Sequence, residues 1–467
     1  DTNLEDTDGN ALSLNTDKGV KRMRQKVIGA NTLRLPSDDE EATNPVNERH
    51  VLLTDGEGEL QPESGGNAPA FLVRRNITGS DGTNGHNAYA QSAIEGVNEN
   101  NTVLLSAGTF NESITVNKAV SIIGDGTDNT TTLDGSDPTL GPNGIEVESD
   151  NITLSGMVVK NFNHGIEVHN GENVENLVLN DIASENNNVG LKVATTGTIE
   201  GLTVTGSHFD GNDFGWNLAK EFKTGEDNST VTNVNVTDTS FSNNSAKGIY
   251  AEKLDNATFT DVTVKNSGTS ETNFFANAGI DINLKDGNYE NITFKGLEIS
   301  GSGFSHIPSE SKPKIGNGIT IKARDVGGPD GAYGENPASL SGVIIEDSPI
   351  EESAITNSSI TSGGDVALAI GNNVDDVKIS NLTATGNETI VLYGGASDIT
   401  IEDSSITSSG FSLRDESYGV GIFGKQNITL KNNDIKAIKT GLHAVGVNGD
   451  NGWITLMGND FRCGDDV

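Results

Sequence analysis

The sequence predicts an all-β protein whose 467 residues wind into a right-handed parallel β-helix, a single-stranded solenoid with an irregular N-terminal leader and a short capping helix. Three observations predict this fold. A short phrase recurs every 21 to 25 residues, aliphatic and polar residues alternate within it, and Gly and Asn fill the turns. Only 33% of the residues are hydrophobic and 5% aromatic, a composition that disfavours a helical bundle.

The recurring phrase is a Gly, an aliphatic residue (Trp once), any residue, and a second aliphatic residue. A second phrase, a strand followed by a turn and another short strand, lies between its copies, so each repeat holds three short strands. Segments 366–370 and 389–393 supply the same strand without the leading Gly. The Gly-led copies begin at Gly144, Gly165, Gly190, Gly215, Gly248, Gly279, Gly318, Gly419 and Gly441.

Each repeat is one coil, because a coil buries its apolar face only by stacking on the next coil at roughly 4.8 Å. The tight corners favour Gly and Asn, which tolerate positive φ best. An antiparallel sandwich is the alternative architecture, since it also uses many short alternating strands. A sandwich gives no reason for a regular repeat, so the solenoid is favoured from about Thr102 to Asp460.

The chain divides into three expected regions. Residues 1–75 form an attachment or leader region, residues 76–126 hold the capping helix and first coil, and residues 127–467 hold the β-helix with a short C-terminal end. A basic island at 18–26 suits an acidic partner, and a solvated face is an equally good explanation.

The formal charge is −37, from 67 acidic and 30 basic residues. Such a surface repels phosphate, so nucleic acid is excluded as a ligand. No apolar run approaches the roughly 20 residues of a membrane-spanning helix. The single Cys463 excludes an intrachain disulfide, so stacking must supply the stability.

Several coils are lengthened by insertions at 219–230, 268–277, 303–317 and 323–339, and the 48 residues from Gly318 to Val366 leave room for an additional coil. Insertions from corresponding corners would wall a groove on the solenoid, where a ligand is expected. Trp216 suits sugar stacking, although a core position explains it equally well. The predicted ligand-binding residues are Trp216, Lys223, His306, Arg324 and Tyr333.

Paired carboxylates would be needed for glycan cleavage, and the best local set is Asp210, Asp213 and Glu221. In so acidic a chain, a structural role is the more frequent explanation of such a set. Carboxylates at calcium-like spacing in 134–137 and 210–213 make Ca²⁺ a possible ligand, although β-helix corners also require Asp-Gly turns. No cofactor is required by the sequence, and no transition-metal site is expected.

The entry to the repeat is its most specific part. A short helix at 90–97, the strand segment 101–116 and the apolar segment 119–126 together resemble the opening of pectate-lyase-like β-helix proteins, a superfamily that includes phage tailspikes. In those families the helix caps the solenoid. The resemblance implies a fold and not an activity, because the superfamily holds lyases, hydrolases and pure binders.

An irregular leader followed by a capped β-helix is also the order of parts in a tailspike. That resemblance implies a homo-oligomer, in tailspikes a trimer, held to a particle or envelope protein through residues 1–75. No large C-terminal trimerisation domain is found after residue 453. This departure argues against the usual tailspike trimer, or else places the trimer contacts in the coils and leader.

Three functions stay open, all on an extracellular protein. The first hypothesis is a virion tail spike or fibre that binds a host surface polysaccharide or glycoprotein. The second is a polysaccharide lyase or glycoside hydrolase on the same rod, so enzymatic activity is left undecided. The third is a cellular secreted or surface β-helix protein.

Overall fold

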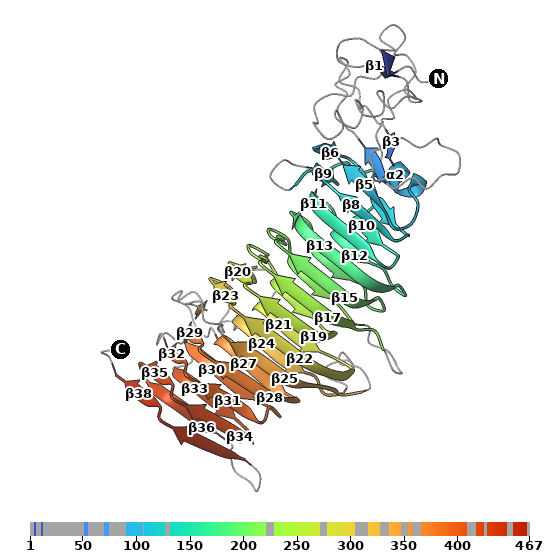
Figure 1. Cartoon of the computed structure of the whole chain (residues 1–467). Coiled ribbons are helices and arrows are strands. Elements are labelled where there is room, and N and C mark those ends of the chain that lie inside the picture. The colour runs from blue at the N-terminus through green and yellow to red at the C-terminus, as the bar shows by residue number, and fades with distance from the viewer. Residues whose placement is uncertain are drawn as a thin grey trace.

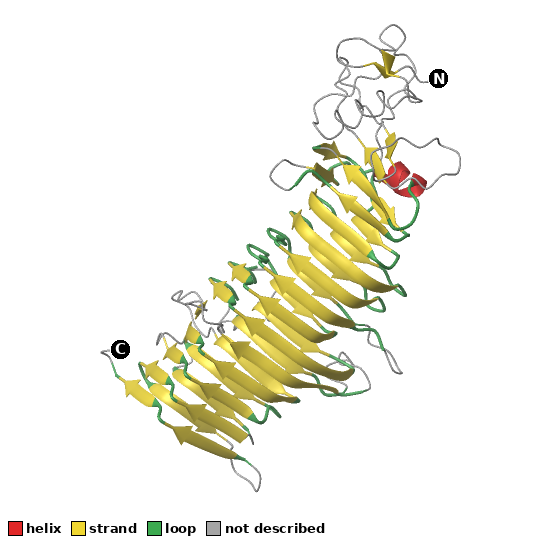
Figure 2. Cartoon of the chain, viewed as in Figure 1, coloured by secondary structure: helices red, strands yellow, loops and turns green. Residues whose placement is uncertain are grey.

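The computed structural model shows an elongated stack of parallel coils with strands on nearly every side (Figures 1 and 2). The coils form the predicted right-handed parallel β-helix. The structure describes residues 4–5, 11–12, 51–54, 70–73, 90–105, 107–126, 131–220, 228–270, 278–303, 316–326, 336–346, 354–356, 366–408, 417–424, 427–445 and 452–464.

The first face of the solenoid is a sheet of 12 parallel strands, one from each coil. The strands that open with the Gly-led phrase all lie in this sheet, as do the two that lack the Gly. In order they are β7 (Ile114–Val116), β10 (Asn143–Val147), β12 (His164–Val168), β14 (Val189–Val193), β16 (Phe214–Leu218), β18 (Lys247–Ala251), β21 (Ala278–Leu284), β24 (Asn317–Ala323), β27 (Val366–Asn372), β30 (Glu388–Tyr393), β33 (Tyr418–Phe423) and β36 (Thr440–Val445).

The second face, here called the long sheet, is formed by the strand that follows in each coil. Its strands pair in parallel, except that β3 joins β4 antiparallel. In order they are β3 (Val51–Thr54), β4 (Ala70–Val73), β5 (Asn101–Leu105), β8 (Val120–Ile123), β11 (Ile152–Lys160), β13 (Asn173–Glu185), β15 (Thr198–Thr205), β17 (Val231–Thr237), β19 (Leu254–Thr260), β22 (Gly287–Lys295), β25 (Ala338–Glu346), β28 (Val374–Ser380), β31 (Ile399–Glu402), β34 (Asn427–Lys431) and β37 (Trp453–Met457).

The third face consists of short strands. At its N-terminal end, β6 pairs with β9, and β9 pairs with the second half of β11. Isolated bridges at His208 and Ser240 then connect β13 to β20. A separate two-stranded pair, β1 (Leu4–Glu5) and β2 (Ala11–Leu12), lies in the leader. The short strands are β6 (Gly108–Phe110), β9 (Thr131–Asp134), β20 (Thr263–Lys265), β23 (Glu298–Ser300), β26 (Ala354–Thr356), β29 (Thr383–Gly386), β32 (Ser405–Ser408), β35 (Asp434–Ala437) and β38 (Asp460–Cys463).

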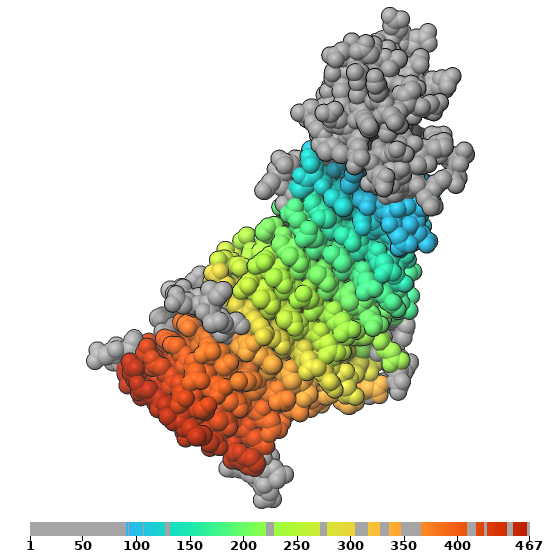
Figure 3. Space-filling model, in the orientation of Figure 1, coloured from blue at the N-terminus to red at the C-terminus, as the bar shows by residue number. Residues whose placement is uncertain are grey.

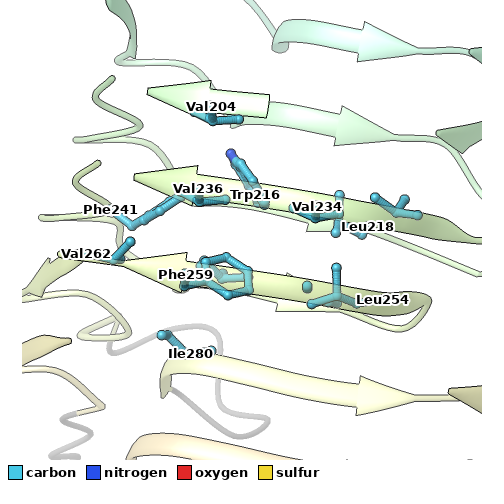
Figure 4. Close-up of a cluster of buried hydrophobic side chains, with 14 of the residues drawn as sticks. Val204, Trp216, Leu218, Val234, Val236, Phe241, Leu254, Phe259, Val262 and Ile280 are labelled. Carbon is cyan, nitrogen blue, oxygen red and sulfur yellow. The ribbon is translucent and has the colours of Figure 1, made fainter. Parts of the chain in front are cut away.

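The core is a continuous column of inward side chains. On the 12-stranded sheet, the first aliphatic residues of the phrase pair in register, as Ile145 with Ile166 and Ile249 with Ile280, and all are fully buried. Figure 4 shows the column around Trp216, with Phe241 on the next coil. The predicted alternation of inward aliphatic and outward polar residues is therefore confirmed.

The helix α2 (Ala90–Gly96) lies at the position of the predicted capping helix and contacts β4, β5 and β7. Glu112 accepts hydrogen bonds from the backbone N–H groups of Ala90 (2.9 Å) and Gln91 (3.2 Å), which satisfies donors at the helix start. Figure 3 shows this blue end of the rod and the red coils of the opposite end. Among the described residues, no helix is long and apolar enough to cross a membrane.

The Gly of the recurring phrase is required by close packing. A Cβ on Gly190 would lie 2.6 Å from the carbonyl oxygen of Gly215 on the next coil. The corners instead use Asn with positive φ, as predicted, for example Asn151 at 56°.

The spacing of the repeat leaves room for an additional coil after Gly318. That possibility is wrong, because β24 pairs directly with β27.

A buried ladder of amides joins the coils at one corner. Asn187 Oδ1 accepts the N–H of Phe162 (2.9 Å), and Asn212 Oδ1 accepts the N–H of Asn187 (2.8 Å). Asn244 Oδ1 accepts the N–H of Asn212 at 2.9 Å. Each amide also donates backward, as Asn244 Nδ2 does to Phe209 O (2.9 Å). At each of these three contacts between coils, the amide oxygen that accepts the hydrogen bond belongs to the later coil.

Candidate functional site

The outer face of the 12-stranded sheet carries an unusual set of charged side chains. The third residue of each Gly-led phrase points away from the core, and these residues pair in register from coil to coil. Several of them are nevertheless buried, because they pack against one another. We define the charged cluster as Lys192, Asn217, Lys247, Tyr250, Glu252, Asp281, Asn283, Lys285, Lys322 and Arg324.

Asp281 is the centre of this cluster, and only 1% of it is exposed. Its carboxylate lies 2.5 Å from Lys247 Nζ and 3.3 Å from Lys322 Nζ. Burial alone would raise the pKa of Asp281, but the two lysine charges outweigh burial and lower that pKa to about 2. Asp281 is therefore ionised at neutral pH and forms ion pairs with the lysines on the strands to either side.

A hydrogen-bonded chain connects the rest of the cluster. Arg324 Nε donates to Asn283 Oδ1 at 2.6 Å, and Asn283 Nδ2 donates to Tyr250 Oη at 3.1 Å. Tyr250 in turn donates to Glu252, whose carboxylate also pairs with Lys285. Burial, and then the charge of Glu252, raises the pKa of Tyr250, so its hydroxyl stays protonated and acts as a donor.

Lys192 and Asn217 form the receptive part of the cluster. They pair in register on β14 and β16, next to Tyr250 on β18, and all three side chains are partly exposed. Asn217 Oδ1 is buried and has no hydrogen-bond partner, and no hydrogen bond of Lys192 Nζ is found among the described residues. Burial lowers the pKa of Lys192, against the opposing charges of Glu167 and Glu252. The Lys192 ammonium group and the Asn217 carbonyl oxygen therefore lie side by side, and both can form further hydrogen bonds.

The predicted insertions do not all leave from one corner. Those at 219–230 and 323–339 connect β16 and β24 of the 12-stranded sheet to β17 and β25 of the long sheet. Those at 268–277 and 303–317 precede β21 and β24. Most residues of the four insertions lie outside the described part of the chain, and only their described ends define these two corners.

Trp216 does not belong to this face. Its side chain has no exposed surface and packs edge-on against Phe209 (5.7 Å between ring centroids) and Phe241 (5.1 Å). Trp occupies the inward position of the phrase, where the other coils have Ile or Leu. The expectation that Trp216 contacts a sugar at the surface is therefore wrong.

The predicted catalytic carboxylates make bonds between coils. Asp210 Oδ2 accepts from Ser240 Oγ (2.7 Å) and its Oδ1 from the N–H of Ser242 (2.6 Å). Asp213 Oδ1 accepts from Ser245 Oγ at 2.5 Å. Both residues lie at the corner between the third face and the 12-stranded sheet, where these bonds stabilise the stack. The third member of the set, Glu221, lies outside the described residues.

Of the predicted ligand-binding residues, Arg324 alone lies in the charged cluster, partly exposed at the end of the hydrogen-bonded chain. Lys223, His306 and Tyr333 lie outside the described residues.

The possible calcium motifs do not fit a cation. Asp134 Oδ1 accepts from Ser136 and Asn161, and Asp137 Oδ1 accepts from Thr139, which are turn and coil bonds. In the described part of the chain, no group of three or more His, Cys, Asp or Glu side chains is arranged to hold a metal.

Sequence reasoning missed most of the charged cluster. Asp281 lies 34 residues from Lys247 and 41 from Lys322, so no local window brings them together. A signal was nevertheless present: the third residue of the phrase reads Glu, Glu, Lys, Asn, Tyr, Asp and Thr in successive coils. Stacking these positions at one strand spacing would have revealed a charged row.

No protein-family model matches the chain, and no curated protein matches its sequence. Several solved structures are similar at low identity. The A-module of the mannuronan C-5 epimerase AlgE4 from Azotobacter vinelandii has 13% identity and a TM-score of 0.41, over 78% of this chain and 87% of that chain.

The pectate lyase Pel9A has 14% identity and a TM-score of 0.39, over 84% of this chain and 80% of that chain. The tailspike protein of E. coli bacteriophage HK620, in complex with a pentasaccharide, has 11% identity and a TM-score of 0.40, over 96% of this chain and 72% of that chain. These neighbours are parallel β-helix proteins. The fold of this chain rests on its own strand pairing.

Proposed function

We propose that this protein is an extracellular rod that binds a surface glycan bearing acidic groups through the outer face of its 12-stranded sheet. The observation that carries the proposal is the excess of basic over acidic side chains within the charged cluster on that face. With Glu167 included, the charged cluster holds five basic and three acidic residues, whereas the whole chain holds 30 basic and 67 acidic residues. A local positive excess attracts an anionic ligand to the cluster, while the anionic remainder of the protein repels it.

The acidic group of the glycan would bind between Lys192 and Asn217. An ammonium group donates to a carboxylate or sulfate, and the buried Asn217 Oδ1 accepts from a sugar hydroxyl. Asp281 and Glu252 pair with the deeper lysines, so the partly exposed Lys192 is the cation that a ligand would meet next to Asn217.

The rod belongs, in this proposal, to a virion tail spike or fibre, and the glycan is a host surface polysaccharide or glycoprotein. The order of parts supports this assignment, because a leader whose sequence lacks the repeat precedes a capped solenoid. Residues 1–75 would attach the rod to the particle, and a homo-oligomer would present several copies of the binding face.

The test compares acidic and neutral polysaccharides on one protein. Wild-type protein should bind polygalacturonate, alginate or hyaluronan in a calorimetric titration, with an affinity that falls as salt rises, and should ignore dextran. Lys192→Glu should abolish the acidic binding. The matched control is Lys378→Ala, because Lys378 is exposed on the long sheet and pairs with Glu402 at 3.1 Å. Equal effects of the two substitutions would overturn the proposal.

A lyase on the same face is the second candidate. Burial lowers the pKa of Lys192, and a lysine that gives up its proton more readily is suited to act as a base. Lys192→Arg keeps the charge but removes the base, since arginine does not deprotonate. If wild type releases unsaturated uronate products and Lys192→Arg binds without releasing them, the protein is a lyase. Binding without cleavage in both proteins identifies a pure binder.

A further inference from the structure

A second distinctive patch lies further along the same outer face, on the C-terminal coils. We define the aromatic platform as Tyr393, Tyr418, Phe423 and His443. Tyr393 pairs in register with Phe423, and His443 pairs with Gly421, so β30, β33 and β36 all contribute. These positions point away from the core, as the third residues of the phrase do.

The rings form one packed layer. Tyr418 stacks on His443 with ring centroids 5.5 Å apart and planes 12° apart, and Phe423 lies 5.7 Å from His443 and 5.9 Å from Tyr418. Tyr418 is 3% exposed, whereas Tyr393, Phe423 and His443 remain partly exposed. Tyr418 thus supports the layer, and the other three rings face outward.

Two glycines let the rings lie close to the sheet. A Cβ on Gly371 would be 2.3 Å from the ring of Tyr393, and a Cβ on Gly421 would be 2.3 Å from the ring of Tyr418. The backbone therefore leaves room for a ring at each of these outward positions. The result is a shallow aromatic surface on the water side of the solenoid.

The long sheet offers a comparison within the same coils. Its outward row there reads Lys378, Thr400 and Thr429, side chains that water solvates well. Partly exposed rings on the 12-stranded sheet have no role in the core, and leaving their apolar surface in water is unfavourable. A partner with an apolar face would remove that cost.

The platform and the charged cluster share one row. From Asp281 the register runs through Thr320, Ala369 and Val391 to Gly421. Five strand steps separate β16, which carries Asn217, from β30, and eight separate β14, which carries Lys192, from β36. The acidic subsite and the platform are therefore roughly 25–40 Å apart at about 4.8 Å per step. That separation is within reach of one oligosaccharide.

We infer that the aromatic platform is a second carbohydrate subsite, which stacks the apolar face of an uncharged sugar in the same glycan. The inference rests on the proposed function for the acidic subsite. Aromatic rings bind the C–H face of a pyranose, while the hydroxyl groups at the sugar edge stay solvated. The substrate class is thereby narrowed to heteroglycans that combine acidic and neutral sugars.

The experiment uses hyaluronan oligosaccharides, which alternate an acidic and an uncharged sugar, and xylohexaose, which is neutral. Phe423→Ala with His443→Ala should weaken hyaluronan binding about tenfold. Phe423→Trp, which keeps an aromatic face, should retain it. Thr429→Ala, at an outward position of the long sheet on a neighbouring strand, is the control, and thermal unfolding verifies that each variant folds.

The outcomes separate the two ideas. Wild-type affinity for hyaluronan in the Phe423 and His443 double variant overturns the platform, while loss of binding in Lys192→Glu still supports the acidic subsite. Binding of xylohexaose that requires Phe423 but ignores Lys192, with no binding of hyaluronan, upholds the platform and overturns the acidic function. Failure of wild type to bind either probe overturns both.

Discussion

The outer faces of the long sheet and of the 12-stranded sheet obey the same stacking rule but hold different chemistry. On the long sheet the outward row reads Thr203, Asn235, Thr258 and Thr293, small polar side chains in contact with water. On the 12-stranded sheet the equivalent row includes the buried Asp281. The coils stack on the long sheet with only small hydroxyl and amide side chains outside, so stacking does not require buried charges. The unfavourable burial of charge on the 12-stranded sheet therefore indicates a function there.

The largest expected effect comes from Asp281→Ala. Removal of this carboxylate leaves Lys247 and Lys322 as buried, unpaired cations, so the free energy of unfolding should fall by about 3–5 kcal/mol. Thr258→Ala on the long sheet should change it by less than about 0.5 kcal/mol. Urea unfolding of the two variants measures both values. Similar losses would show that the two faces do not differ in the way described.

Acid should remove the contribution of Asp281 selectively. A carboxylate with a lowered folded pKa contributes stability that is present above its unfolded pKa, here 3.8, and is lost as pH falls through the folded pKa of about 2. The stability advantage of wild type over Asp281→Asn should therefore shrink by about 2 kcal/mol between pH 4 and pH 2. Parallel denaturant titrations across that interval measure the difference. A constant difference would contradict the lowered pKa.

Trp216→Phe should have the smallest of these effects, about 1 kcal/mol on unfolding. The substitution loses volume in the core, but it also removes a buried indole N–H that has no hydrogen-bond partner. Glycan affinity per folded molecule should stay at the wild-type value, because Trp216 has no surface contact. A drop in glycan affinity without a drop in the free energy of unfolding would show that Trp216 contributes to ligand binding.

The fold could be predicted because its signal is local and repeated. Gly190 allows the close approach of the next coil, and Leu191 supplies an inward side chain. The same pair of residue types recurs in most coils. The capping helix could be located for the same reason, since Ala90 to Val97 is a single short segment.

The site could be predicted only in part, because it is built across coils. Arg324 was identified from an insertion, but its partner Asn283 lies 41 residues earlier. Trp216 lies on the predicted strand. The sequence placed it in the ligand-binding set although a core position explained it equally well, and its register places it inward. The lengths of the insertions determine how many residues separate two stacked side chains in the sequence. Composition alone does not reveal that separation.

The buried amide ladder favours the addition of coils in one order, from the N-terminus to the C-terminus. Asn212 and Asn244 each bond to a coil that lies nearer the N-terminus. During synthesis, the chain leaves the ribosome in that order, so every newly made coil brings the side chain that fastens it to a coil already in place. The capped N-terminal end can therefore serve as the template for these coils, and each new coil supplies the amide oxygen that binds a backbone N–H of the coil before it.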